Sequence, residues 1–170
     1  MENIGKELAK QAKAKGICQE WHNELKGQND VGKLAEMYLK GIDFCLANNF
    51  PPVEYIRRNF KGKMEAFGVH LDDRLAVTND KKVVALGTCS GMVEIKEYGV
   101  SEVFIKHMSS IVIVARDNSF VMVDMFDDSS LNIIAGDNAK VCVNRYGGTV
   151  QFSRFDNAVV KVIEKNKKTY

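Results

Sequence analysis

A pair of apolar residues at positions i and i+2 recurs along the second half of the chain, and its period constrains the fold more than any other feature. Successive pairs begin nine or ten residues apart, which suits one short strand followed by one turn. Units of this size bury their apolar faces only by stacking on one another. The sequence therefore predicts an array of small β units. The pairs are Val83/Ala85, Val93/Ile95, Val103/Ile105, Val112/Val114, Val121/Val123, Leu131/Ile133, Val141/Val143, Val150/Phe152 and Val160/Val162.

The residue two positions before most of these pairs is small. Because side chains alternate across a strand, this residue faces the same side as the pair. A small residue at the same end of every unit indicates that neighbouring strands run in the same direction, since an antiparallel meander would alternate the small end. This favours a parallel β-solenoid over a β-sandwich or a barrel. The small residues are Ser101, Ser110, Ser119, Ser129, Ala139, Gly148 and Ala158.

The turns indicate how many strands form one coil. Asp117-Asn118, Asp137-Asn138 and Asp156-Asn157 occupy alternate turns, whereas the turns between them read Asp127-Asp128 and Tyr146-Gly147. Turns that stack directly should match, so we expect two strands per coil and four to five coils. A three-sided coil fits the spacings almost as well, but its wider interior is hard to fill with Val, Ser and Ala at protein packing density.

The first third of the chain has helical periodicity. We expect helices within residues 2–14 and 18–25, a longer helix capped by Asp30 with an apolar stripe from Val31 to Leu46, and a short helix after Pro51-Pro52. The predicted fold is thus α+β. It comprises a helical cap or subdomain at 1–70, a connector at 71–82, the solenoid at 83–163 and a charged tail at 164–170 that would protect the last coil from edge-to-edge pairing.

Composition excludes several classes of protein. The chain has 24 basic and 22 acidic residues and a formal charge of +2, without the basic bias of domains that bind duplex nucleic acid. No apolar run suits a signal peptide or a membrane span, so we expect a cytoplasmic protein with no membrane partner. The four cysteines lack CxxC spacing, which favours reduced thiols over disulfides or a zinc site.

The aspartates of the alternate turns are weak candidates for a metal site. Asp117, Asp137 and Asp156 would form a ladder of carboxylates along one edge, and such ladders bind calcium in some solenoids. The glycine-rich GGxGxD pattern of those repeats is missing, and Asp is a common turn residue for conformational reasons. A structural role in the turns is therefore the favoured interpretation.

Cys89 is the candidate nucleophile. Gly87-Thr88-Cys89-Ser90-Gly91 has the form G-x-nucleophile-x-G, but another repeat strand follows it where a hydrolase has a helix. Neither His70 nor His107 is tied to Cys89 by spacing, so glycine at a turn is the better explanation. With no phosphate-binding loop or dinucleotide fingerprint, we predict no catalytic residue and no cofactor.

The outward face of the array is the candidate partner-binding surface. A soluble monomer rarely exposes so many contiguous apolar side chains, so the helical segment, a second subunit or a partner protein should cover part of them. The predicted outward residues are Phe104, Ile111, Ile113, Phe120, Met122, Met125, Phe126 and Ile134, and the first seven are the predicted partner-binding residues.

Two resemblances bear on function. The repeat at 83–162 resembles the short β-solenoids of the bactofilin and adhesin-head kind. The whole chain is similar to an uncharacterised family carried by bacterial mobile elements and phages, most clearly in KGIDFCLAN (40–48), VVALG (83–87), VCVNRYGG (141–148) and the KKTY ending. The second resemblance implies no activity, but it implies a phage-related or host-interacting role.

These features give three expectations for function. The leading one is a non-enzymatic binding or assembly protein that uses the solenoid as a rigid platform. Such a protein would bind a protein partner or form a homo-oligomer. The alternative is a phage-type factor that binds or inhibits a host protein or a nucleotide ligand. The third is a hydrolase-like enzyme that uses the aspartate edge or Cys89.

Overall fold

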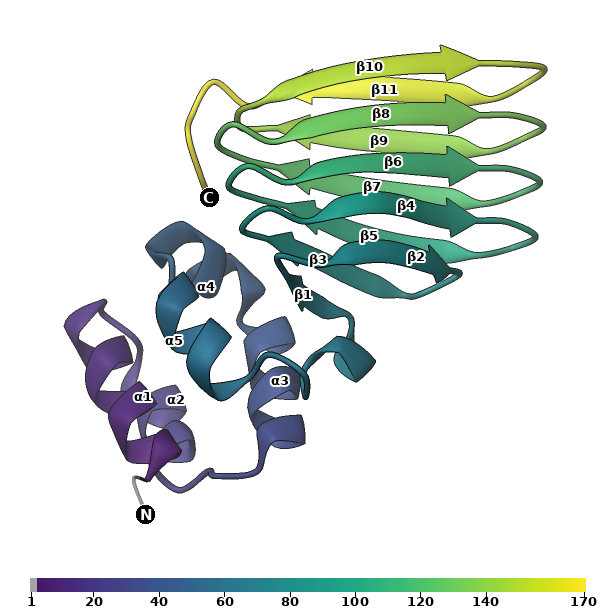
Figure 1. Ribbon diagram of the computed structural model, residues 1–170. Coiled ribbons are helices and arrows are strands. Elements are labelled where there is room, and N and C mark those ends of the chain that lie inside the picture. The colour runs from purple at the N-terminus through teal and green to yellow at the C-terminus, as the bar shows by residue number, and fades with distance from the viewer. Residues whose placement is uncertain (1–2) are drawn as a thin grey trace. The chain divides into compact units, whose positions relative to one another are not determined.

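The computed structural model describes residues 3–170 and divides the chain into two compact units. One unit is helical and extends to Phe67, with Tyr170 assigned to it; the other is a β-solenoid formed by Gly68–Thr169 (Figure 1). Within the described residues, no helix has the length and hydropathy needed to cross a bilayer. The predicted α+β class, with helices before a parallel solenoid, is confirmed.

The helical unit contains five short α-helices and one 3-10 turn. Asn3 and Asp30 cap the first and third helices, accepting hydrogen bonds from the N–H groups of Lys6 (3.0 Å) and Lys33 (2.9 Å). The capping role predicted for Asp30 is therefore confirmed. The elements are α1 (Ile4–Ala14), α2 (Gln19–Lys26), α3 (Val31–Lys40), α4 (Ile42–Asn48), α5 (Val53–Asn59) and η1 (Glu65–Phe67).

The longer helix expected after Asp30 is in fact two helices that meet at Gly41. Gly41 has φ −100° and ψ 30°, ends α3 by donating its N–H to the Met37 carbonyl at 2.9 Å, and begins α4. Glycine is a poor helix former, so the break costs little there. The apolar stripe continues across the break, which is why periodicity alone predicts one helix.

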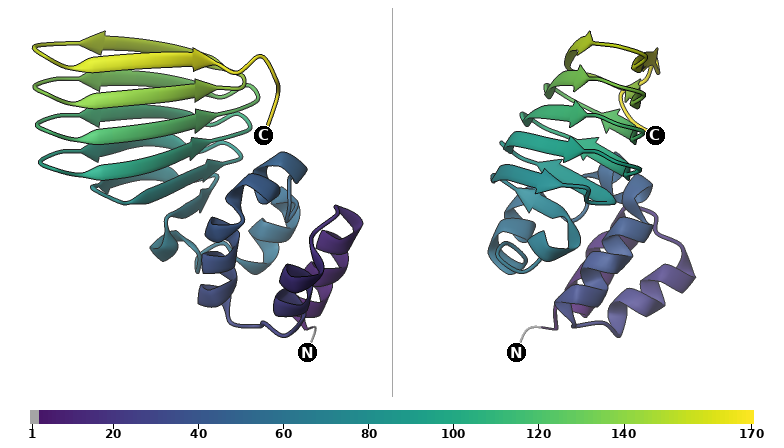
Figure 2. Two further views of the ribbon diagram at one scale, coloured as in Figure 1. Left: turned by 180° about the vertical axis from the view of Figure 1, so that it is seen from behind. Right: turned by 90° about the vertical axis from the view of Figure 1, so that its right-hand side faces the viewer.

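The solenoid consists of two parallel sheets, and each coil contributes one strand to each sheet (Figures 1 and 2). This confirms two strands per coil, and there are about five coils. Sheet A contains β1 (Val69–Leu71), β3 (Lys82–Leu86), β5 (Val100–Ile105), β7 (Phe120–Met125), β9 (Lys140–Arg145) and β11 (Val159–Glu164). Sheet B contains β2 (Arg74–Thr78), β4 (Ser90–Ile95), β6 (Ser110–Ala115), β8 (Ser130–Ala135) and β10 (Thr149–Arg154).

The core lies between the sheets and is made of residues that stack in register from coil to coil. Val103 and Val123 pair in sheet A, Ile113 and Ile133 pair in sheet B, and all four are at most 1% exposed. Small residues fill the narrow ends of the coils: Ser101, Ser119, Ser129, Ala139 and Ala158 are buried, as predicted.

Three residues predicted to face outward face the core instead. Ile111 and Ile113 are in register with core residues of β8, and Met125 lies two residues after buried Val123; all three are at most 1% exposed. Strand β6 is apolar at every position after Ser110, so its alternation does not distinguish the two faces. Stacking on β8 decides the register, and the small residue at its end is Ser109, not the predicted Ser110.

The connector predicted at 71–82 is part of the solenoid. Strand β2 occupies Arg74–Thr78 and pairs with β4, and its Leu75 joins the core at 4% exposure. Asn79 is a turn residue with φ 57°, and its side chain accepts a hydrogen bond from the Lys96 N–H at 2.9 Å. The first coil has only one short apolar pair and a different turn, so the repeat pattern does not reveal it.

Candidate partner-binding surface

An exposed apolar strip crosses three strands of sheet A; we call Val100, Phe120, Met122 and Cys142 the sheet-A strip. Val100 is in register with Phe120, and Met122 with Cys142. Phe120 and Met122 are two residues apart on β7 and therefore share a face. Exposure is 62% for Val100 and 37% for each of the two β7 residues. Phe120 and Met122 thus lie on the outer face, as the sequence predicts, and their role in binding remains a prediction.

Charged side chains border the sheet-A strip. Glu102 is in register with Met122, and Lys140 is in register with Phe120; both charged residues are exposed. An apolar centre with both signs of charge around it is the usual composition of a protein interface. The strip therefore has the character of a contact surface.

Two further predicted contact residues point outward but are buried. Phe104 is 5% exposed and Phe126 is fully buried. The Phe126 ring stacks on the Tyr146 ring of the next coil, with centroids 4.7 Å apart and an interplanar angle of 15°. The prediction that Phe104 and Phe126 offer a contact surface is therefore wrong. Lys106 and Tyr146, at the matching positions of the two adjacent coils, cover Phe126. These contacts can be predicted only when the number of residues per coil is known.

The Phe126–Tyr146 stack lies between two lysines. The Lys106 ammonium is 5.2 Å from the Phe126 centroid, and the Lys165 ammonium is 5.9 Å from the Tyr146 centroid. Lys106 is 4% exposed, and its Nζ is 3.1 Å from Asp127 Oδ2. Burial of a lysine is tolerated when it has a carboxylate partner and an aromatic face. The row formed by Lys106, Phe126, Tyr146 and Lys165 lies along one edge of the solenoid.

The aspartates proposed as metal ligands bind backbone instead. Asp117, Asp137 and Asp156 have φ of 57°, 54° and 56°. Each accepts the N–H of the matching turn residue in the coil before it, over 2.7, 3.0 and 3.3 Å. Within residues 3–170, no three His, Cys, Asp or Glu side chains are placed to share a metal ion. The carboxylates therefore have a structural role, because they satisfy turn donors that would otherwise need water.

Cys89 is in the core rather than in a reactive site. It is 1% exposed, and the Asp73 N–H donates to its sulfur at 3.5 Å. Burial raises the pKa of the Cys89 thiol, and the backbone hydrogen bonds of Asp73 and Leu86, which lower it, do not offset this effect. The neutral thiol is thus favoured, whereas a nucleophile needs a stabilised thiolate.

The flanking glycines of the Cys89 motif are explained by the backbone. Gly87 and Gly91 have φ of 68° and 116°, which favour glycine, and a Cβ at Gly91 would lie 2.1 Å from the Leu75 carbonyl oxygen. This supports the interpretation of the motif as a turn.

His107 occupies the place that aspartate has in the matching turn of the next coil. The ring Nδ1 of His107 accepts a hydrogen bond from the Gly87 N–H at 3.0 Å, and the backbone N–H of His107 donates to Asp127 Oδ2 at 3.1 Å. Burial lowers the pKa of the His107 ring, and the neighbouring Lys106 charge lowers it further. The folded turn therefore requires the neutral ring, because only a neutral Nδ1 accepts a hydrogen bond.

The free energy of unfolding should fall in acid through His107. The folded pKa is below the ordinary value of 6.5, so the unfolded chain takes up the proton first. The contribution of the neutral ring to the free energy of unfolding is complete above about pH 6.5, and it is lost as the pH falls through the pKa of His107 in the folded chain. His107→Asn keeps an acceptor and a residue suited to positive φ but cannot titrate. In urea denaturation, the free energy of unfolding should fall less between pH 7 and 5 for this variant than for the wild type. Equal losses in the two proteins would contradict the role assigned to His107.

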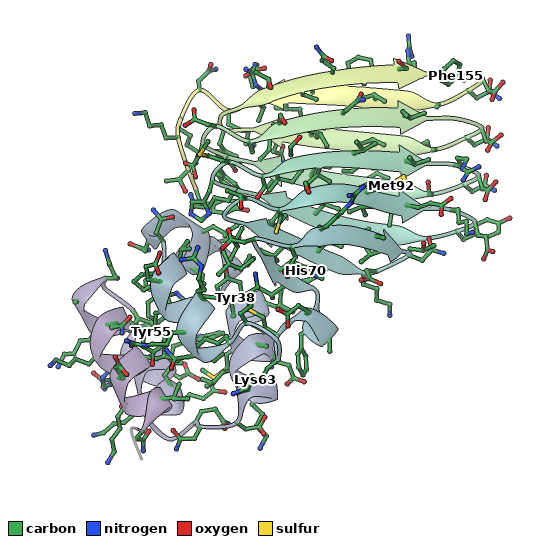
Figure 3. The ribbon with its side chains drawn as sticks, viewed as in Figure 1. Tyr38, Tyr55, Lys63, His70, Met92 and Phe155 are labelled. Carbon is green, nitrogen blue, oxygen red and sulfur yellow. The ribbon has the colours of Figure 1, made fainter. Side chains whose placement is uncertain are left out.

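The outward residues predicted from the sequence include neither Val100 nor Cys142 of the strip, nor Met92 on sheet B, whereas Ile134 is exposed as predicted. Val100 precedes the inward Ser101, so the same alternation that identifies Phe120 would have placed it on the outer face. On sheet B, Met92 is 45% exposed and Ile134 is 41% exposed; Figure 3 shows Met92 on β4. The two sheets thus provide matched test and control positions.

No protein-family model matches this chain, and no curated protein or solved structure matches it either.

Proposed function

We propose that this chain is a non-enzymatic binding or assembly protein, with the solenoid as a rigid platform and the sheet-A strip as its contact with a partner protein. The supporting observation is the exposure of Val100, Phe120 and Met122 on adjacent strands of one sheet. Contiguous apolar side chains rarely remain exposed on a soluble protein unless something binds them.

Rigidity supports the same proposal. The strip lies on strands whose opposite faces form a continuous core, in which Val103 and Val123 are essentially fully buried. Side chains on such a scaffold lose little conformational entropy when a partner binds, and this preorganisation favours affinity. A partner that presents apolar side chains with a charged border would complement the strip.

Phe120→Lys should abolish partner capture. The substitution places a charge at the centre of the strip, where a bound partner would desolvate it. Ile134→Lys is the matched control, because Ile134 has similar exposure on the outer face of sheet B. Affinity purification from a lysate of the producing cells should yield one stoichiometric protein with the wild-type chain and with Ile134→Lys, but not with Phe120→Lys. Equal yields from all three, or no stoichiometric protein from the wild type, would contradict the proposal.

A further inference from the structure

The C-terminal end of the solenoid is open. At the N-terminal end, all three residues of β1, the edge strand of sheet A, are buried, whereas β2, the edge strand of sheet B, is exposed at Arg74, Ala76 and Thr78. At the other end, β10 and β11 are the edge strands of sheets B and A, and none of their residues is buried. Residues 165–169 run back along the turns beside the stack and do not cross this end (Figures 1 and 2). The charged tail therefore does not protect the last coil in the way that the sequence suggests.

Strand β10 directs half of its backbone hydrogen-bonding groups toward the open end. The N–H groups of Thr149 and Phe155 donate to carbonyls of the preceding coil at 3.0 and 2.9 Å. In a parallel ladder, alternate residues direct both backbone groups to the same neighbour. The groups of Val150, Phe152 and Arg154 consequently face away from β8, toward the open end.

Strand β11 has the same arrangement. The N–H groups of Val159 and Lys165 donate to carbonyls of the β9 coil at 2.9 and 3.0 Å. Val160, Val162 and Glu164 therefore direct their backbone groups toward the open end. Both sheets thus end in an unpaired strand edge at the same level, which is the feature that natural β proteins usually cover.

Apolar side chains accompany these edges. Phe152 is in register with core residue Ile133 but is 45% exposed, because no further coil covers it. Val162 continues the core column above Val143 and is partly exposed. Phe155 and Val159, at the turn that joins the two strands, are 58% and 46% exposed, and Figure 3 shows Phe155 at this turn.

We infer that the C-terminal coil pairs with the same coil of a second copy of this chain, in a closed two-fold dimer with antiparallel β10 and β11 edges. Because every residue of β1 is buried, the N-terminal end of a copy does not offer both of its sheet edges to an incoming coil. The C-terminal end does offer both edges, so pairing of this end with itself extends both sheets, and a two-fold axis across the solenoid axis makes the paired strands antiparallel. Such an interface is isologous and stops at two subunits. Both sheets and the core then continue from one copy into the other.

Charge at the two ends of the coil fits this arrangement. Arg154 and Glu164 are the last residues of β10 and β11, at opposite ends of the coil, and both are exposed. A two-fold axis perpendicular to the sheets reverses the strands, so Arg154 of one copy meets the coil end that holds Glu164 of the other. Glu164 is already paired with Arg145 of its own chain at 2.9 Å, so Arg154 of the second copy would join this ion pair at each end of the joint. Lys161 is in register with Cys142 on the outer face and does not point into the joint.

Sedimentation velocity over a concentration series tests the dimer on the full chain. The wild type should show a monomer–dimer equilibrium with no larger species. Phe152→Lys should raise the dissociation constant by at least about tenfold, because it places a charge at the centre of the joint. Ile134→Lys is the matched control, because Ile134 has similar exposure but lies outside the C-terminal coil, and it should dimerise like the wild type. A chain that stays monomeric at all concentrations, forms larger species, or loses its dimer through Ile134→Lys would overturn the inference.

Amide hydrogen exchange tests the paired edges without a substitution. Protection of the Phe152 and Val162 N–H groups should increase as protein concentration drives dimerisation, whereas the Gln151 N–H, on the β8 side of its strand, should exchange at a constant rate. Protection that does not depend on concentration at Phe152 and Val162 would overturn the inference. This outcome is independent of the sheet-A strip, so failure here and failure of partner capture are distinguishable.

Discussion

Ile113→Ala is expected to lower the free energy of unfolding by about 2–5 kcal/mol, the cost of emptying a well-packed core site. The Ile113 side chain is fully buried and stacks in register with Ile133 of the next coil and Val93 of the preceding one. A cavity at this point removes contacts from three coils at once. Urea denaturation followed by circular dichroism measures the loss.

Two controls separate the core from the outer face. Val114→Ala lies next to Ile113 on the opposite face of β6, and Ile134→Ala removes an exposed side chain of sheet B. Each should cost much less, about 0.5 kcal/mol, as is usual for surface positions. A larger loss for Val114→Ala than for Ile113→Ala would mean that β6 has the opposite register.

Phe126→Ala is expected to cost about 3–5 kcal/mol, although Phe126 lies outside the space between the sheets. Its fully buried ring stacks on Tyr146 and receives the Lys106 ammonium on its face. Truncation would remove the aromatic contact and open a cavity beside a buried charge whose remaining partner is Asp127. The thermal unfolding midpoint and the urea midpoint should both fall.

Phe155→Ala is the control, at a turn on the opposite edge of the solenoid. Phe155 belongs to the turn after β10 and is 58% exposed, so its truncation should change stability by about 0.5 kcal/mol or less. Similar effects of the two substitutions would show that the stack of aromatic rings and lysines contributes nothing beyond ordinary turn contacts.

The solenoid is predictable from the sequence because its physical requirements repeat. Small residues such as Ser119 and Ala139 must fit the narrow end of every coil, and Asp137 must satisfy a turn donor of the coil before it. These requirements recur at each coil, so they reveal parallel stacking and the number of strands per coil. Gly41 occurs once, and nothing in the local periodicity distinguishes a helix break from a continuous helix there.

The candidate surface is only partly predictable, because exposure depends on what neighbouring coils cover. Phe120 and Phe126 both point outward from β7 or its turn, yet the first is 37% exposed and the second is fully buried under Tyr146 and Lys106. Ile111 fails for another reason, since β6 is apolar on both faces and only pairing with β8 fixes its orientation. Tertiary contacts, and not residue type, determine both outcomes.

Photo-crosslinking from the sheet-A strip tests the central claim, that the solenoid is a platform for a partner protein, most directly. A photoreactive phenylalanine derivative replaces Met122 in one variant and Ile134 in another, because the two side chains have similar exposure on opposite sheets. Irradiation of cells that produce each variant is followed by identification of the crosslinked species. If the sheet-A strip binds a partner, one discrete protein should be crosslinked from position 122 and not from position 134. No product from position 122, or the same products from both positions, would contradict it.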